Sequence, residues 1–253
     1  MSEGRDNLQH ESALALVGRV LYGSYAWLVF VLIALGLLVW LLFVSNVQRR
    51  RHYAGVAARL VMRCSFHPLH VTGLEHLPQG QCVVAANHAS YIDAIVIKAV
   101  LPDRFAYVVK REMAAVPLAG LLLELLGTEF VERFNRHRGG VDARRVLRTV
   151  SSGQALLFFP EGTFVGEPGL LKFNNGAFKS AVAANCPVVP CVLHGTRHIL
   201  PSPRFFPRPG RVQVEVLEPI IPDPNMSVEE QVTTLRERTR AAILSRLGEP
   251  DRG

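Results

Sequence analysis

Cysteine is scarce in this sequence, and its positions form no recognised framework. The four cysteines among 253 residues are Cys64, Cys82, Cys186 and Cys191, which is too few for the disulfide network of a small secreted domain. Cys186 and Cys191 lie five residues apart, and no histidine or cysteine pair elsewhere completes a zinc-binding set with them. We therefore predict four reduced thiols in a cytosolic environment and no metal site.

Sequence signatures of several other protein classes are also missing. An RNP-like aromatic box and a basic region followed by heptads are both absent, so nucleic acid is not the expected partner of the net charge of +7. Without a Gly-x-Ser-x-Gly motif, a lipase or thioesterase has no recognisable nucleophile. Internal repeats and low-complexity segments are absent as well. The basic charge then points to an anionic lipid surface or a phosphorylated substrate.

Residues 25–44 contain no charged residue. Their sequence is YAWLVFVLIALGLLVWLLFV, and a helix of this length, rising about 1.5 Å per residue, spans the roughly 30 Å hydrocarbon core of a bilayer. We predict a transmembrane helix here, preceded by an N-terminal segment, residues 1–24, whose apolar part lies in the interface or packs against the span. A cleaved signal peptide fits less well, because the run is too long and no small-residue cleavage site follows it.

Three arginines, Arg49–Arg51, follow the apolar run closely. Basic residues beside a span predict that this side faces the cytoplasm, and pairing with anionic headgroups would contribute about 1 kcal/mol per arginine. Residues 45–64 are expected to form a basic juxtamembrane helix. A single-pass helix and a helical pair that dips into one leaflet are both consistent with this pattern. In either case residues 65–253 are expected on the cytoplasmic side as one domain.

Apolar runs alternate with helical patterns from residue 65 to the C-terminus. Strands are expected at His70–Leu74, Cys82–Ala86, Phe105–Val109, Glu129–Val131, Ala155–Phe159, Val188–Leu193 and Arg211–Leu217. Helices are expected at Asp93–Val100, Pro117–Leu126, Val141–Ser151, Ala177–Ala184 and Ser227–Leu247. This alternation predicts an α/β fold: a mixed, largely parallel sheet flanked by helices, with an N-terminal transmembrane or membrane-embedded helix.

His88 and Asp93 follow the strand expected at 82–86, in the segment NHASYID. Ligands of open α/β sheets gather at the carboxyl ends of strands. A carboxylate beside an imidazole fixes its tautomer and stabilises the imidazolium, as a general base requires. Because no protein nucleophile is evident, such a pair would activate a substrate hydroxyl for attack on an activated acyl carbonyl. The spacing alone is weak evidence, since a helix-capping aspartate and a core histidine are the better explanation when it is the only signal.

Three further segments place polar residues at strand ends. In FPEGTF, residues 159–164, Glu161 lies between a proline and a glycine. The proline ends the strand, and the glycine allows the backbone to approach a ligand closely. GTEFVER, residues 127–133, ends on Arg133, whose guanidinium suits bidentate binding of phosphate. PVVP, residues 187–190, opens another strand. An ordinary turn and a solvated surface arginine are the alternatives for the first two.

Taken together, the four segments resemble the glycerophosphate and lysophosphatidate acyltransferase family. The motifs of that family are Asn-His-x4-Asp, Gly-x-x-Phe-Ile-x-Arg, Phe-Pro-Glu-Gly-Thr-Arg and Val-Pro-x-x-Pro, and the resemblance covers about residues 65 to 220. It implies that His88 is the general base and Asp93 its orienting partner. The substrate-binding residues that it implies are Gly127, Arg133, Glu161, Gly162 and Thr163. The residues implied on the acyl side are Pro187, Val188, Val189 and Pro190.

The resemblance also implies the substrates. An acyl group would pass from acyl-CoA or acyl carrier protein to the hydroxyl of a lysophospholipid, expected to be 1-acylglycerol 3-phosphate, giving phosphatidate without a cofactor. Membrane lipids are the other expected partner. One departure matters: Phe164 stands where the family has an arginine, so a phosphate ligand is missing, and Lys172 and Arg197 are candidate replacements. An acyltransferase for a lipid acceptor without phosphate, and a membrane-bound binding module without catalysis, remain as alternatives.

Overall fold

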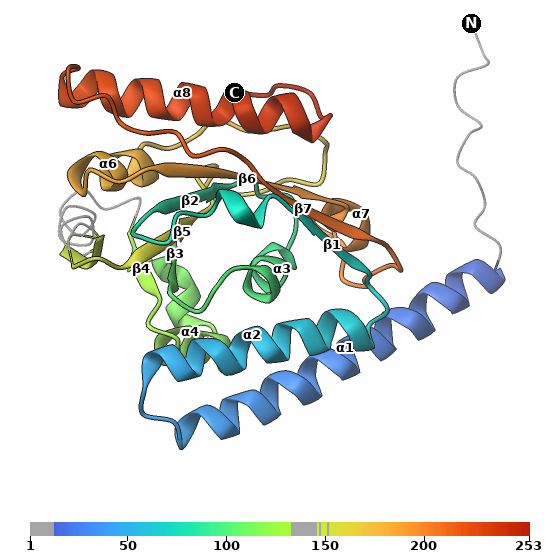
Figure 1. The fold of residues 1–253 in the computed structure, drawn as a ribbon. Helices are drawn as coiled ribbons and strands as arrows, with labels where there is room; N and C mark the ends of the chain where they lie inside the picture. The colour runs from blue at the N-terminus through green and yellow to red at the C-terminus, as the bar shows by residue number, and fades with distance from the viewer. Residues whose placement is uncertain (1–12, 133–145, 147, 151) are drawn as a thin grey trace, which may run out of the picture.

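The computed structural model describes residues 13–132, 146, 148–150 and 152–253, which form an α/β domain beside two long N-terminal helices (Figure 1). The strands are β1 (Leu69–Thr72), β2 (Val83–Ala86), β3 (Phe105–Lys110), β4 (Glu129–Val131), β5 (Ala155–Phe158), β6 (Val188–His194) and β7 (Val212–Val216). They form one sheet in the order β1-β7-β6-β2-β5-β3-β4. Neighbouring strands are parallel except β6 and β7, which run antiparallel. The predicted mixed, largely parallel sheet is confirmed.

Helices cover both faces of this sheet (Figure 1). They are α1 (Ala13–Leu42), α2 (Val47–Cys64), α3 (Asp93–Val100), α4 (Ala119–Leu125), α6 (Gly176–Ala183), α7 (Thr196–Ile199) and α8 (Val228–Leu247), with short 3-10 helices η1 (Leu74–His76) and η2 (Arg111–Ala115). A capping box begins α8, in which the side chains and backbone of Ser227 and Glu230 bond reciprocally. The helix expected at Val141–Ser151 lies largely outside the described residues.

The central strand β2 is buried on both faces, and its side chains alternate between two cores. Val84 and Ala86 pack with residues of α2 and α3 on one side of the sheet. Val83 and Ala85 pack with residues of α6 and α8 on the other side. Successive side chains of a strand point to opposite faces, so an unbroken apolar run is what a strand covered on both sides requires.

The N-terminal helix is longer than the predicted span. α1 runs without a break from Ala13 to Leu42, so one helix continues across the expected boundary between the segment at 1–24 and the span at 25–44. The absence of charged residues identified the segment that a bilayer could accommodate. The helix itself extends further, because a helix continues wherever no helix-breaking residue interrupts it. The helix ends before residue 44 because the chain must reverse into α2, whose first turn is capped by Asn46 accepting from the Arg49 N–H at 3.0 Å.

α1 lies beside α2 along the domain and leaves most of its own surface uncovered (Figure 1). Side-chain hydrogen bonds attach it to the domain: the hydroxyls of Tyr22 and Tyr25 donate to the carbonyls of Ser65 and Cys64 at 2.7 and 2.8 Å, and the Trp27 indole N–H donates to the Phe205 carbonyl at 2.8 Å. Its exposed apolar side chains include Leu21, Leu28, Leu32, Leu35, Val39 and Leu42. By length and composition, α1 is able to cross a membrane.

Candidate active site

Asp93 and His88 meet just beyond the carboxyl end of β2. Asp93 begins α3 and is fully buried. Its Oδ2 accepts hydrogen bonds from the His88 Nδ1 at 2.8 Å and from the backbone N–H groups of Ala89 and Ser90 at 2.6 and 2.8 Å. Because a carboxylate can only accept, a neutral His88 carries its proton on Nδ1 and keeps a lone pair on Nε2. This geometry allows His88 to act as a general base.

The loop that carries His88 is tied to the segment around β6. The Asn87 side chain accepts from the Leu193 N–H at 2.7 Å and donates to the Leu193 carbonyl at 3.1 Å. The Ser90 hydroxyl donates to the Leu200 carbonyl at 2.7 Å. Both side chains are buried, so the loop is held on either side of His88. Sequence reasoning missed these roles, because each partner lies more than a hundred residues away along the chain.

Glu161 holds the same loop from the opposite side. Its Oε1 accepts from the His88 backbone N–H at 2.6 Å, and its Oε2 accepts from the Leu171 N–H at 2.9 Å. Burial raises the pKa of the Glu161 carboxyl to about 7, although its two backbone hydrogen bonds act in the opposite direction. Both oxygens are therefore engaged with the protein backbone, while the resemblance implied acceptor binding. Gly162 follows with a φ of +77°, a conformation that favours glycine.

Aromatic rings enclose the His88 imidazole. Phe159 stacks on it with ring centroids 4.4 Å apart, and Phe164 lies at 4.5 Å with a tilt of 57°. Tyr91 meets the edge of Phe164 at 4.8 Å and is itself exposed. The His88 side chain keeps 19% of its surface accessible, which is enough for contact with a substrate. Phe164 thus lies against the His88 imidazole, where the family pattern has an arginine.

The other residues implied in substrate binding are Gly127, Thr163 and Arg133, of which the structure describes the first two. Gly127 has a φ of +65° between α4 and β4, and its carbonyl accepts from the Arg51 guanidinium of α2 at 3.2 Å. Thr163 is exposed in the loop after Glu161. Arg133 lies outside the described residues. The roles assigned to these three residues therefore remain predictions.

The four residues expected on the acyl side lie at the start of β6. Val188 and Val189 are fully buried, in the α8-side and α2-side cores respectively. Val188, Val189 and Pro190 stand opposite Val83, Val84 and Ala85 of β2. Pro187 precedes the strand, and its carbonyl accepts from the Val83 N–H at 3.0 Å. Any effect of these side chains on an acyl group must therefore pass through the packing of the sheet.

The two candidate replacements for the missing arginine differ in availability. Arg197 is occupied: its guanidinium pairs with the Glu249 carboxylate at 2.9 and 3.1 Å and donates to the carbonyls of Val165 and Glu167. Lys172 is exposed to solvent. Arg197 therefore serves to join two loops and is not free to bind the phosphate of an acceptor.

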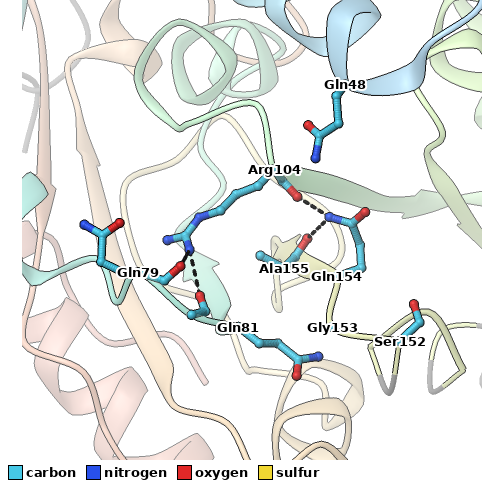
Figure 2. Close-up of a pocket in the computed structure, with 9 residues that line it drawn as sticks. Gln48, Gln79, Gln81, Arg104, Ser152, Gly153, Gln154 and Ala155 are labelled. Carbon is cyan, nitrogen blue, oxygen red and sulfur yellow. Dashed lines mark hydrogen bonds between the residues drawn. The ribbon is translucent and has the colours of Figure 1, made fainter.

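A hollow of about 310 Å³ lies at the other ends of the strands, away from His88, and lacks comparable chemistry (Figure 2). It opens where β3 and β5 begin, and among the described residues that line it Arg104 alone is charged. The Arg104 guanidinium donates to the carbonyls of Pro78, Gln79 and Gly80, which leaves little capacity for a ligand. Among the described residues, the imidazole–carboxylate pair at His88 is the better candidate for catalysis.

Comparison with known proteins found a matching family model and several relatives of this chain. Residues 68–194, which contain both His88 and Glu161, match the family model described as Acyltransferase. The 1-acyl-sn-glycerol-3-phosphate acyltransferase alpha of Mus musculus is 38% identical over 159 residues, covering 59% of this chain and 54% of that protein. The 1-acyl-sn-glycerol-3-phosphate acyltransferase of Haemophilus influenzae is 30% identical over 173 residues, covering 66% of this chain and 70% of that protein.

The matched regions differ in extent among the relatives. The chain spans between 46% and 66% of the length of three eukaryotic relatives. A solved structure, that of the 1-acyl-sn-glycerophosphate (LPA) acyltransferase PlsC from Thermotoga maritima, superimposes with a TM-score of 0.75 over 91% of this chain and 96% of that one. At 22% sequence identity, this likeness concerns the fold alone.

Proposed function

The chain belongs to the acyltransferase family, and on that premise we propose that it transfers a fatty acyl group to the hydroxyl of a lysophospholipid. The proposed acceptor is 1-acylglycerol 3-phosphate, the substrate named by its relatives, and the product is phosphatidate. The proposed donor is a thioester, acyl-CoA or acyl carrier protein. The observation that carries the proposal is the hydrogen bond between His88 Nδ1 and the buried Asp93 carboxylate.

In the proposed mechanism, His88 acts through Nε2. It accepts the proton of the acceptor hydroxyl as that oxygen attacks the thioester carbonyl carbon. Asp93 keeps the other proton on Nδ1 and stabilises the imidazolium that forms. Collapse of the tetrahedral adduct breaks the carbon–sulfur bond, and the leaving thiolate takes the proton back from Nε2. The acyl group passes directly between the substrates, so the reaction needs neither a protein nucleophile nor a cofactor.

The surroundings of His88 fit this reaction. Phe159 and Phe164 cover the imidazole with apolar surface, which limits the access of water that would hydrolyse the thioester. Glu161, which follows β5, and the pairing of Asn87 with Leu193 of β6 fix the loop on two sides, so the base is held in position before substrate arrives.

The position of Phe164 favours a second candidate, an acyltransferase for a lipid acceptor without phosphate. A phenylalanine against the imidazole offers apolar contact where an arginine would offer charge. The purified protein should be assayed with lysophosphatidate and with a phosphate-free hydroxyl lipid of the same chain length. Preference for lysophosphatidate removes the second candidate, and preference for the phosphate-free lipid removes the first acceptor.

We also propose that α1 attaches the protein to a membrane with the catalytic domain on the cytoplasmic side. Its contacts with α2 and with the segment around Phe205 occur along much of its length, which supports a monotopic helical pair over a single spanning helix. Labelling of single cysteines placed along α1, from each side of sealed vesicles, tests this. Labelling of opposite ends from opposite sides would establish a single-pass topology instead.

The central experiment replaces His88 by alanine. Loss of acyl transfer to lysophosphatidate, with unchanged far-UV circular dichroism and melting temperature, is the expected result. His52→Ala is a matched control, because His52 forms the same kind of pair with Asp103 at 2.9 Å on the exposed surface of α2. Activity should survive in this control. Retained activity in His88→Ala would refute the mechanism.

A further inference from the structure

A second hollow lies beside the active site, between the loop after β5 and the segment after β6. Its volume is about 650 Å³, and Gly166, Gly195 and Arg208 are among its lining residues. The same two segments carry parts of the catalytic site. The first contains Glu161 and Phe164, and the second contains Leu200, which accepts the Ser90 hydroxyl. His88 and Asp93 do not line this hollow, so it is a neighbouring site that is distinct from the catalytic pair.

Positive charge dominates the lining of this hollow. Its basic side chains are Arg197, His198, Arg204 and Arg208, and its acidic side chains are Glu167 and Glu249. Both acids already have a basic partner: Glu249 pairs with Arg197 at 2.9 Å, and Glu167 lies 3.9 Å from Arg252. The guanidinium groups of Arg204 and Arg208 make no hydrogen bond or ion pair within the described part of the chain. Their charge is available for a ligand.

The backbone that carries these two arginines is well fixed. The Arg204 N–H donates to the Pro201 carbonyl at 2.8 Å, and the Arg208 N–H donates to the Ile199 carbonyl at 2.9 Å. Across the hollow, Gly166 approaches Ser202 so closely that a Cβ would lie 2.2 Å from the Ser202 carbonyl oxygen. A rigid site loses less entropy when it binds a ligand.

The same segment also contacts the apolar helix α1. Phe205 stacks on Trp27 with ring centroids 5.3 Å apart, and Phe206 lies against Gly23. The segment that lines the hollow with Arg204 and Arg208 therefore also contacts the apolar helix. A ligand with an apolar chain at one end and phosphoryl groups at the other suits this position.

The position of the hollow relative to His88 indicates which of the two substrates it would bind. In 1-acylglycerol 3-phosphate, the phosphate sits on the carbon next to the one that bears the reacting hydroxyl, so it must lie close to the imidazole. In acyl-CoA, the pantetheine arm separates the thioester from the diphosphate and the 3′-phosphate of the nucleotide. A basic hollow without His88 in its lining fits the donor. Arginine is also the side chain best suited to bidentate contact with phosphate.

We propose that this hollow binds the phosphoryl groups of the acyl donor, with Arg204 and Arg208 as their ligands and the nucleotide end of acyl-CoA as the occupant. The proposal rests on the function proposed above and adds a site to it. Acyl carrier protein presents a single phosphodiester on its pantetheine arm, so it would use the two arginines less fully. Anionic headgroups near α1 are a different source of the same phosphate chemistry.

Binding of CoA to the full-length protein in detergent tests the site without relying on activity. The variants are Arg204→Gln, Arg208→Gln and the double variant, with Arg238→Gln on the exposed face of α8 as a charge-matched control. Loss of one charged hydrogen bond should weaken CoA binding about tenfold for each arginine. Removal of the 3′-phosphate, tested with dephospho-CoA, should reduce the affinity of the wild type more than that of the double variant. The control should bind CoA as the wild type does.

Kinetics and vesicle binding separate the remaining explanations. The double variant should show a raised KM for acyl-CoA with a nearly unchanged kcat, and unchanged binding to phosphatidylglycerol vesicles. Equal CoA binding by wild type and double variant overturns the proposal, as does a loss confined to vesicle binding or to transfer from acyl carrier protein. CoA binding that depends on both arginines without any transfer to lysophosphatidate would refute the proposed function and leave this site standing.

Discussion

Replacement of Glu161 by glutamine changes one atom of a buried side chain on which the catalytic loop depends. The carboxylate accepts hydrogen bonds from two backbone N–H groups, those of His88 and Leu171. A glutamine amide has a single acceptor oxygen, so one of these N–H groups would face the NH₂ group instead. A buried donor left without a partner costs about 1–3 kcal/mol. We therefore expect Glu161→Gln to fold with reduced stability and with the His88 loop displaced.

The pH dependence of this difference gives a sharper test. Burial raises the pKa of Glu161 from 4.5 to about 7 in the folded protein, so the folded state holds its proton to higher pH than the unfolded state does. The stabilising contribution is fully present below pH 4.5 and is lost as pH rises through 7. A shift of this size corresponds to about 3 kcal/mol. The stability advantage of wild type over Glu161→Gln should fall by roughly that amount between pH 4.5 and pH 8.

Urea unfolding at the two pH values, followed by far-UV circular dichroism, measures this difference. Tryptophan fluorescence is unsuitable, because the two tryptophans, Trp27 and Trp40, both lie in α1. Subtracting the free energy of unfolding of the variant from that of the wild type cancels the contributions of the other titrating groups. An equal stability difference at both pH values would show that the pKa of Glu161 is not raised in the folded protein, and would refute the burial argument.

Kinetics of the same variant separate two roles of Glu161. If Glu161 positions the base, the substitution should lower kcat, by about 10² for a displacement near 1 Å, with little change in the KM for lysophosphatidate. If Glu161 contacts the acceptor, as the family resemblance implies, the substitution should raise that KM instead. A raised KM with unchanged kcat would contradict the positioning role.

Two further predictions concern single sites. Asp93→Asn should lower kcat by about 10⁴ without loss of fold, because an amide can donate to the imidazole and favour the wrong tautomer; a pH–rate profile and circular dichroism check this, and near-normal kcat would contradict it. Gly73→Ala should destabilise the protein by several kcal/mol more than Gly248→Ala. Both glycines have positive φ, but only at Gly73 would a Cβ meet a backbone atom, 2.0 Å from the Val216 carbonyl oxygen, so equal urea midpoints for the two variants would argue against the clash.

Local sequence patterns predicted most of the elements of this fold. The apolar run at 82–86 indicated a strand buried on both faces, and Val83–Ala86 is the strand β2 at the centre of the sheet. The helix expected from Ser227 begins one residue later, at Val228, with Ser227 as its N-terminal cap. These predictions succeeded because strand burial and helix capping depend on side chains within a few positions of one another.

The sequence by itself also indicated the proposed catalytic pair, since His88 and Asp93 are five residues apart and one turn brings them together. The tertiary structure alone decided what surrounds them. Glu161 reaches the His88 loop because β5 is the sheet neighbour of β2, and Asn87 reaches Leu193 because β6 lies on the other side. Strand order follows from the packing of the whole chain, and no local pattern encodes which distant strand ends will meet.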